Sequence, residues 1–341
     1  MVFVPVVDRD QRALMPTTPS RARRWIRRGE ATPFWKRGVF CVRLNRAPSD
    51  QKTQDIAVGI DPGSKKEGLT VKSEAHTFLN IQADACSWVS DAVTTRRQMR
   101  RARRSRKTPC RANRKNRKNR IRGSLPPSTK ARWQWKLRLC HWLGKMYPIS
   151  RFVVEDIKAK TTGKRRWDRV FSPLEIGKAW FYGALAGLAP VETRQGYETK
   201  ELRDRLGLKK SRARMAETFA AHCVDSWVLA HWWTGGHIAP DNTRLLCISP
   251  LRFHRRQLHV LQPARGGKRK GYGGTRSQAF TRGSLVRHPT HGLTYIGGTD
   301  GSRVSLHSLS DGKRLCQNAS PSDCKFLTFA SWRARLLPAA S

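Results

Sequence analysis

Apolar residues dominate three short segments between residues 56 and 82, and turn-forming residues separate them. β-Branched and aromatic residues in runs of this length predict β-strands, and the short connections predict an antiparallel meander. The same pattern predicts a strand near the amino end and two more in the middle of the chain. The strand segments are VFVPVVD (2–8), IAVGI (56–60), GLTVKSE (68–74), HTFLNIQA (76–83), RFVVEDI (151–157) and PVETRQGY (190–197).

Helical periodicity appears in three later segments. In 129–148, Trp135, Leu139, Trp142 and Leu143 recur at spacings of three and four, which predicts an amphipathic helix that buries them. Residues 174–189 predict a second helix, and 205–233 contain a long one. His222 and Asp225 lie three apart in that last segment, so a continuous helix would place them on one face.

Beyond Pro250 the pattern changes again. Gly, Ser and Thr become frequent, and residues 283–315 alternate like short strands with turns at HPTHG, GGTDGS and SDGK. The preceding segment KRKGYGGTRS (268–277) predicts a basic, glycine-rich loop. A small β-barrel or curled sheet is therefore expected in 251–341, with loops that could enter a nucleic-acid groove.

Charge narrows the class of partner. The chain of 341 residues has 68 Lys and Arg against 24 Asp and Glu, a net charge of +44, which would repel itself unless a polyanion neutralised it. Fifteen Lys or Arg and no acid lie between 96 and 122. Nucleic acid is the expected partner. A membrane is not, because no apolar run approaches the roughly 20 residues of a spanning helix.

Two arginine-rich helices are the expected phosphate contacts, although a solvated charged face is the alternative for each. The first, in TTPSRARRWIRRGEA, is predicted to begin near Thr18 or Ser20 and end at Gly29. Pro109 ends the second. The expected contacts on the two helices are Arg21, Arg23, Arg24, Arg27, Arg28, Arg96, Arg97, Arg100, Arg101, Arg103, Arg104 and Arg106, and those in the basic loop are Lys268, Arg269 and Lys270.

Three acids stand out because acids are scarce. Asp61 and Glu155 end predicted strands, and Asp225 lies on a predicted buried helix face. Asp61 precedes Pro62-Gly63, so ordinary turn chemistry explains it equally well in isolation. Together the three could hold two Mg²⁺ ions for phosphodiester hydrolysis, and His222 could orient or deprotonate the attacking water. No cofactor other than Mg²⁺ is expected, and the eight scattered cysteines predict free thiols in a reducing cytoplasm.

The order of these elements resembles an RNase H-like fold, and GIDPGSKKEG, VVEDI and HCVDSWVLA resemble the three RuvC motifs. ALMPTTPSRARRWIRRGEA is similar to the PLMP module of the transposon-encoded RNA-guided nucleases IscB and IsrB, with Ala13 in place of the first proline. RRQMRRARRSR resembles their bridge helix. The segment between Asp156 and Ala221 contains no histidine or cysteine, so an HNH nuclease cannot lie there. The chain therefore resembles IsrB, the relative that lacks HNH.

That resemblance implies an α/β protein with an RNase H-like (RuvC) core. Its expected parts are a PLMP module (1–52), RuvC part I (53–85), an arginine-rich bridge helix (86–125), RuvC parts II and III (126–250) and a β-rich domain that contacts the target-adjacent motif (251–341). The catalytic residues would be Asp61, Glu155, His222 and Asp225.

The implied activity is that of a Mg²⁺-dependent DNA nickase. The protein would be a monomer bound to a guide (omega) RNA, and the complex would be cytoplasmic and nucleoid-associated in a prokaryote. It would cut the displaced strand of a target DNA duplex. Two other classes stay open: a non-catalytic RNA-binding scaffold and a junction-resolving RuvC-type endonuclease without a guide.

Overall fold

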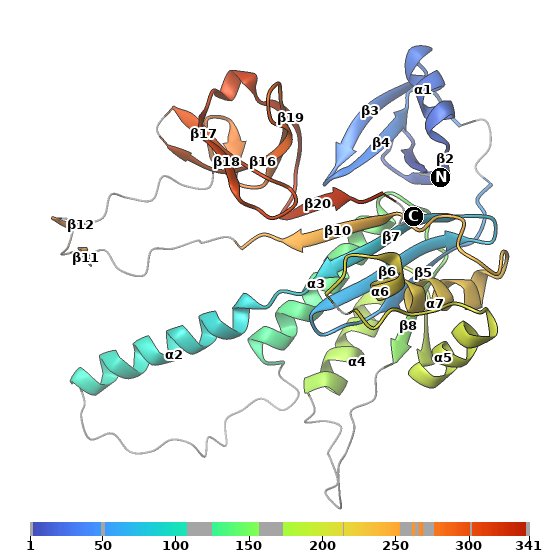
Figure 1. The fold of residues 1–341 in the computed structure, drawn as a ribbon, viewed down its shortest axis with the longest axis horizontal. Coiled ribbons are helices and arrows are strands. Elements are labelled where there is room, and N and C mark those ends of the chain that lie inside the picture. The colour runs from blue at the N-terminus through green and yellow to red at the C-terminus, as the bar shows by residue number, and fades with distance from the viewer. Residues whose placement is uncertain are drawn as a thin grey trace, which may run out of the picture.

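The computed structural model describes residues 3–48, 52–107, 125–156, 173–213, 215–252, 261–262, 266–268, 276–300 and 302–338. These residues form a mixed α/β structure around a seven-stranded sheet, with a four-stranded and a five-stranded sheet beside it (Figure 1). The basic segment KTTGKRRWDRVF (160–171), for which the sequence predicts a loop, lies outside the described residues, as do Cys110, Arg269 and Lys270.

The central sheet has the strand order β20-β10-β7-β6-β5-β8-β9. Its middle is the predicted meander, in which β5, β6 and β7 pair antiparallel. β8 and β9 continue the sheet parallel to β5. This arrangement agrees with the RNase H-like order expected from the sequence. The strands are β5 (Ile56–Asp61), β6 (Lys66–Ser73), β7 (Thr77–Asp84), β8 (Arg151–Asp156), β9 (Val191–Gln195), β10 (Leu245–Pro250) and β20 (Trp332–Leu336).

Helices cover both faces of this sheet, and the alternation of side chains along each strand divides the core between them. On β10, Leu246 and Ile248 join the cluster that contains α3 (Pro127–Gly144), whereas Leu245 and Cys247 join the cluster of α7 (Val224–Thr234). α4 (Pro173–Ala186) packs beside α3. α7 approaches so closely that a Cβ on Gly59 would lie 1.8 Å from a backbone oxygen of α7. We call the two sides the α3 face and the α7 face.

The predicted stripe of α3 is confirmed, because Trp135, Leu139, Trp142 and Leu143 are all buried. The predicted helix at 174–189 and the strands at 151–157 and 190–197 are confirmed as well.

The long helix predicted in 205–233 is wrong in its continuity. A separate helix, α5 (Gly196–Arg205), follows β9 directly, begun by a capping box between Gln195 and Glu198. The chain then forms a loop and two short helices, α6 (Phe219–His222) and α7, interrupted at Cys223. The Cys223 thiol donates to the backbone oxygen of Ile81 in β7, which ties this break to the sheet. His222 and Asp225 therefore lie on different helices.

The amino-terminal sheet has the order β2-β1-β4-β3 and is covered by α1 (Pro19–Arg27). The predicted start and end of α1 are confirmed: the Thr18 side chain accepts from the Arg21 backbone N–H, and Gly29 has a φ of 69°. Ala22 is buried against the sheet, and all five arginines of the predicted contact face are exposed. The strands are β1 (Val4–Val7), β2 (Ala13–Thr17), β3 (Ala31–Lys36) and β4 (Val39–Leu44).

The carboxyl-terminal part contains the predicted short strands in a sheet of order β18-β17-β16-β15-β19. The last strand differs from expectation. β20 leaves this sheet and pairs with β10 at the edge of the central sheet, where Trp332 packs edge-on against both Trp135 and Trp142. The strands are β11 (Leu261–Gln262), β12 (Gly267–Lys268), β13 (Arg276–Ser277), β14 (Phe280–Thr281), β15 (Ser284–His288), β16 (Gly292–Asp300), β17 (Arg303–His307), β18 (Arg314–Ala319) and β19 (Lys325–Phe329).

α2 (Trp88–Lys107) projects away from the central sheet (Figure 1). Its seven predicted contact arginines, from Arg96 to Arg106, are all exposed. No helix in the described parts of the chain is long and apolar enough to span a membrane.

Candidate active site

Three carboxylates from separate elements meet on the α7 face. Asp61 is the last residue of β5, and Glu155 lies on the adjacent parallel strand β8, one residue past the pair Ile60–Val154. Asp225 lies in the first turn of α7, which packs on β5. Asp61 and Asp225 both repel the charge of Glu155, so the three acids share one site. The structure thus brings together the three acids expected from the sequence.

A lysine that the sequence analysis did not identify joins two of these acids. Lys210, in the loop before α6, donates from Nζ to Asp61 Oδ2 at 3.2 Å and to Asp225 Oδ2. Arg203 of α5 donates to the other oxygen of Asp225 at 2.7 Å. Asp225 is only 5% exposed, so these two cations compensate its buried charge. In a chain this basic, no sequence signal separates Lys210 from its neighbour Lys209.

Burial and neighbouring charge both act on Glu155. Burial, followed by repulsion from Asp61 and Asp225, raises the pKa of Glu155 to about 7, and Lys210 only partly offsets this. The wall beside it is close, because a Cβ on Gly196 would lie 3.4 Å from Glu155 Oε1. The site therefore holds more carboxylate charge than its cations balance, and perturbed carboxyls of this kind are typical of functional sites.

The donor set suits a hard cation. Carboxylate oxygens are the preferred protein ligands of Mg²⁺ and Ca²⁺, and a bound cation would relieve the repulsion that raises the pKa of Glu155. As the side chains stand, no group of three or more His, Cys, Asp or Glu among the described residues is arranged to hold a metal ion. The ammonium of Lys210 bridges Asp61 and Asp225 in this arrangement. A cation would have to replace it.

His222 ends α6, near Asp61 and Lys210. Burial and the positive charge of Lys66 lower its pKa below 6.5, so the imidazole is neutral at pH 7. Its Nε2 atom is buried and has no hydrogen-bond partner within the described part of the chain. A neutral imidazole nitrogen of this kind can accept a proton.

Two other acids of the central sheet point to the α3 face, and each has a lysine partner there. Asp156, next to Glu155, accepts from Lys178 at 2.8 Å and from Tyr182 at 3.1 Å, both on α4. Glu67 is 1% exposed and pairs with Lys136 of α3 at 2.8 Å. The sequence could not separate Glu155 from Asp156 by type, whereas strand alternation does so directly.

The expected nucleic-acid contacts have mixed outcomes. The arginines of α1 and α2 are exposed, as a phosphate-contacting face requires. Lys268 lies in β12, and Arg269 and Lys270 lie outside the described residues. These positions are remote in sequence from the three carboxylates. The structure by itself does not assign them a ligand.

Comparisons with known proteins add two likenesses. Residues 4–165 match the model of a protein family described as RRXRR protein. Among solved structures, the chain is similar to RuvC from T. thermophilus, determined in complex with a Holliday junction substrate. The identity is 14%, the TM-score is 0.27, and the match covers 52% of this chain and 90% of that one. A likeness at that score carries no argument, so the candidate site rests on its own geometry. No curated protein matches.

Proposed function

We propose that this protein is an RNA-guided DNA nickase with a single RuvC-type nuclease centre. The observation that carries the proposal is the meeting of Asp61, Glu155 and Asp225 on one face of the central sheet, with more negative charge than Lys210 and Arg203 neutralise. The match of residues 4–165 to the RRXRR family and the RuvC-like motifs of the sequence support the same assignment.

In this proposal Asp61, Glu155 and Asp225 hold two Mg²⁺ ions. When bound, such ions activate a water molecule and stabilise the leaving 3′-oxygen of a phosphodiester. With the carboxylates engaged by metal, Lys210 would be free of Asp61 and Asp225 and could contact a phosphate of the bound strand. Arg203 keeps its bond to Asp225 and so orients that carboxylate. His222 accepts the proton of the attacking water at Nε2, which has no other partner among the described residues.

Guidance by RNA is supported by charge and by resemblance. The net charge of +44 demands a polyanion, and the exposed arginines of α1 and α2 offer it two surfaces. The PLMP-like and bridge-helix-like segments resemble those of IscB and IsrB. Base pairing of the guide would select the target strand, and the protein would hold the heteroduplex through its backbone. The five-stranded sheet would read the target-adjacent motif.

A single nuclease centre supports nicking of one strand, the displaced one. The interval between Asp156 and Ala221 has no histidine or cysteine for a second, HNH-type centre. In this respect the chain resembles IsrB rather than IscB. The protein would act as one copy in a prokaryotic, nucleoid-associated ribonucleoprotein.

The test uses the full chain purified with its co-expressed RNA and a supercoiled plasmid that carries the matching target. We expect Mg²⁺-dependent conversion to the nicked circle, which Asp61→Asn abolishes while RNA binding is unchanged. Replacing Arg100, Arg101, Arg103 and Arg104 with Ala should reduce RNA binding and its salt dependence, by roughly one unit of slope per lost phosphate contact.

The same assay decides between the proposal and its alternatives. If no condition yields nicking and RNA still binds, the protein is a scaffold. If RNA-free protein cuts four-way junctions as fast as the complex does, it is a junction resolvase. If nicking survives Asp61→Asn, the site assignment is wrong.

A further inference from the structure

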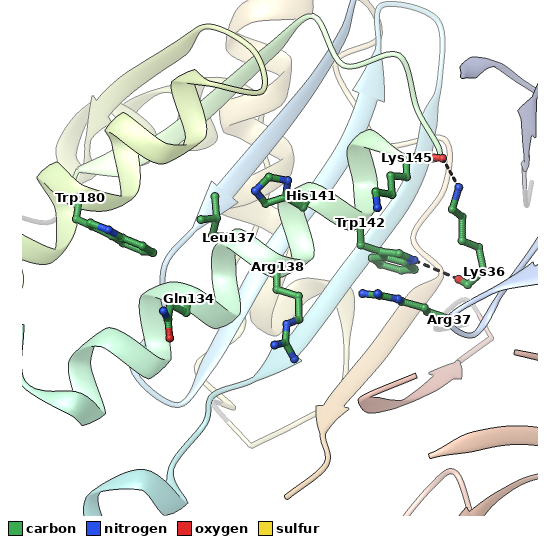
Figure 2. A pocket seen from close by; sticks show the side chains of 9 residues that line it. All are labelled: Lys36, Arg37, Gln134, Leu137, Arg138, His141, Trp142, Lys145 and Trp180. Atoms are coloured by element: carbon green, nitrogen blue, oxygen red, sulfur yellow. Dashed lines mark hydrogen bonds between the residues drawn. The ribbon is translucent and has the colours of Figure 1, made fainter. Parts of the chain in front are cut away.

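A basic pocket lies on the α3 face, between the β3–β4 turn, α3 and α4. It encloses about 510 Å³, within the range of roughly 300–1,000 Å³ that is typical of small-molecule sites. Figure 2 shows side chains from all three elements around it, with Trp180 of α4 on one side and Arg37 on the other. The lining residues are Lys36, Arg37, Gln134, Leu137, Arg138, His141, Trp142, Lys145 and Trp180.

Four cations line this pocket, and no acid does. Among the described residues, none of Lys36, Arg37, Arg138 and Lys145 has a carboxylate partner within ion-pair distance. This contrasts with the buried lysines of the same face, Lys136 and Lys178, which pair with Glu67 and Asp156. The pocket therefore leaves its positive charge for an external anion.

The protein's own contacts hold these cations around the opening. Lys36 donates from Nζ to the Lys145 backbone oxygen at 2.9 Å, and its own backbone oxygen accepts from Trp142 Nε1 at 3.1 Å (Figure 2). Arg138 donates to the Ser331 hydroxyl at 3.0 Å, while the Arg37 guanidinium lies over the ring of Trp332. The cations are thus positioned by neutral acceptors and aromatic rings, which leave their charge uncompensated.

The pKa values of Lys36 and Arg37 reflect the closeness of the positive charges around the pocket. Burial lowers the pKa of Lys36, and the neighbouring charges of Lys145 and Arg37 lower it further, although Cys41 acts in the opposite direction. Burial, followed by repulsion from Arg138, lowers the pKa of Arg37. An anion bound between them would remove that repulsion.

We propose that this pocket binds one unpaired nucleotide of a single-stranded nucleic acid. Trp180, half-buried, offers a ring on which a base can stack, whereas Trp142 is fully buried beneath the opening. Lys36, Arg37 and Arg138 surround the space for the flanking phosphates. Aromatic stacking combined with unpaired cations is the combination by which proteins hold single strands without reading sequence.

The pocket lies away from the candidate active site. Trp142 and Leu139 of α3 pack with Phe152 and Val154 of β8, whereas Glu155 points to the opposite face of that strand. A nucleotide in this pocket is consequently separated by the central sheet from any strand at the carboxylates. The pocket holds a different part of the bound nucleic acid from the part that would be cut.

The test is photochemical cross-linking of the full-length protein to a short uridine RNA that contains thiouridine, and to the matching thymidine DNA that contains thiothymidine. Salt is raised to suppress contacts made by phosphates alone. We expect a cross-linked peptide that contains Trp180. Preference for the RNA assigns the pocket to the guide, and preference for the DNA assigns it to an unpaired target strand.

Variants make the assignment specific. Trp180→Ala should weaken binding of the fluorescently labelled oligonucleotide at least about fivefold, the lower end for loss of one stacked base, and Trp180→Phe should restore most of it. Arg138→Ala should lower the salt slope by about 0.7. The matched controls are Trp232→Ala, on the α7 face, and Arg132→Ala, an exposed arginine of α3 that does not line the pocket.

Three results would overturn the proposal: cross-links confined to α1 and α2, equal effects of Trp180→Ala and Trp232→Ala, or equal cross-linking of a duplex oligonucleotide. Asp61→Asn should cross-link as the unchanged protein does. Failure of the nuclease assignment and failure of this pocket are therefore separate outcomes.

Discussion

The two faces of the central sheet use acidic residues in opposite ways. On the α3 face, Glu67 and Asp156 each have a lysine at 2.8 Å, so their charges are balanced within the fold. On the α7 face, Asp61, Glu155 and Asp225 share Lys210 and Arg203, and burial together with the repulsion between the acids raises the pKa of Glu155 to about 7. Balanced acids stabilise the structure, whereas unbalanced acids create a site that attracts a cation.

Positive charges on the α3 face likewise divide into paired and unpaired groups. Lysines that face acids on the α3 face are buried, but the cations around the pocket beside Trp180 have no acid among the described residues. One sheet thus separates a site with surplus negative charge from a site with surplus positive charge. The comparison yields four predictions.

The largest difference is expected between two variants that each neutralise one acid, one on the α7 face and one on the α3 face. Asp61→Asn should lower the nicking rate roughly a thousandfold or more, because a ligand of the proposed metal site is lost. Asp156→Asn should retain nicking, since its partners Lys178 and Tyr182 belong to the α3 face. Plasmid nicking at saturating RNA measures both. If Asp61→Asn and Asp156→Asn both fold and lose nicking to the same extent, the two faces do not differ in function.

Removing half of a balanced pair should cost stability and not chemistry. Glu67→Leu leaves the Lys136 ammonium buried and should lower the free energy of unfolding by about 3–5 kcal/mol. The double variant Glu67→Leu/Lys136→Met should recover most of this loss, because it buries no charge. Urea unfolding measures both variants. A double variant as unstable as the single one would show that the pair does more than balance its own charges.

Lys210→Ala should lower the Mg²⁺ concentration needed for half-maximal nicking, by roughly tenfold or less, since the ammonium competes with the ion for Asp61 and Asp225. Lys209→Ala is the matched control. Isothermal titration with Mg²⁺ gives a readout independent of turnover. Complete loss of nicking with unchanged Mg²⁺ binding would instead mean that Lys210 contacts the substrate.

The smallest effect concerns Asp241, a balanced acid at the far end of the α7 face. Burial opposes its charge, but hydrogen bonds from the Thr77 backbone N–H and from His76 outweigh burial and lower its pKa below 3.8. A lowered pKa stabilises the fold above pH 3.8, and this contribution disappears as the pH falls through the folded pKa.

Asp241→Asn should therefore reduce the unfolding free energy at pH 7 by only about 0.5–1 kcal/mol, because this side chain is exposed and solvent screens its charge. The difference from the unchanged protein should shrink as the pH falls below 3.8. Thermal unfolding followed across pH gives the result, and a difference independent of pH would mean that packing, not charge, is lost.

Local pattern was sufficient for much of the fold. The meander of β5, β6 and β7, the buried stripe of α3 and both ends of α1 follow from periodicity and capping residues, which act over a few neighbours in the chain. Pattern was insufficient at Cys223, where the predicted helix is interrupted and the thiol contacts β7. Pattern also missed β20, because Trp332–Leu336 gains its sheet partner from a strand more than eighty residues away.

For the candidate site, the sequence by itself singled out three acids in a chain with few: Asp61 and Glu155 end predicted strands, and Asp225 lies on a predicted buried helix face. Only the tertiary structure decided how they are balanced. Lys210, Arg203 and the pocket beside Trp180 carry no distinguishing signal in so basic a chain. Electrostatic balance depends on distance and burial in three dimensions, and both are set by packing between elements that are remote in sequence.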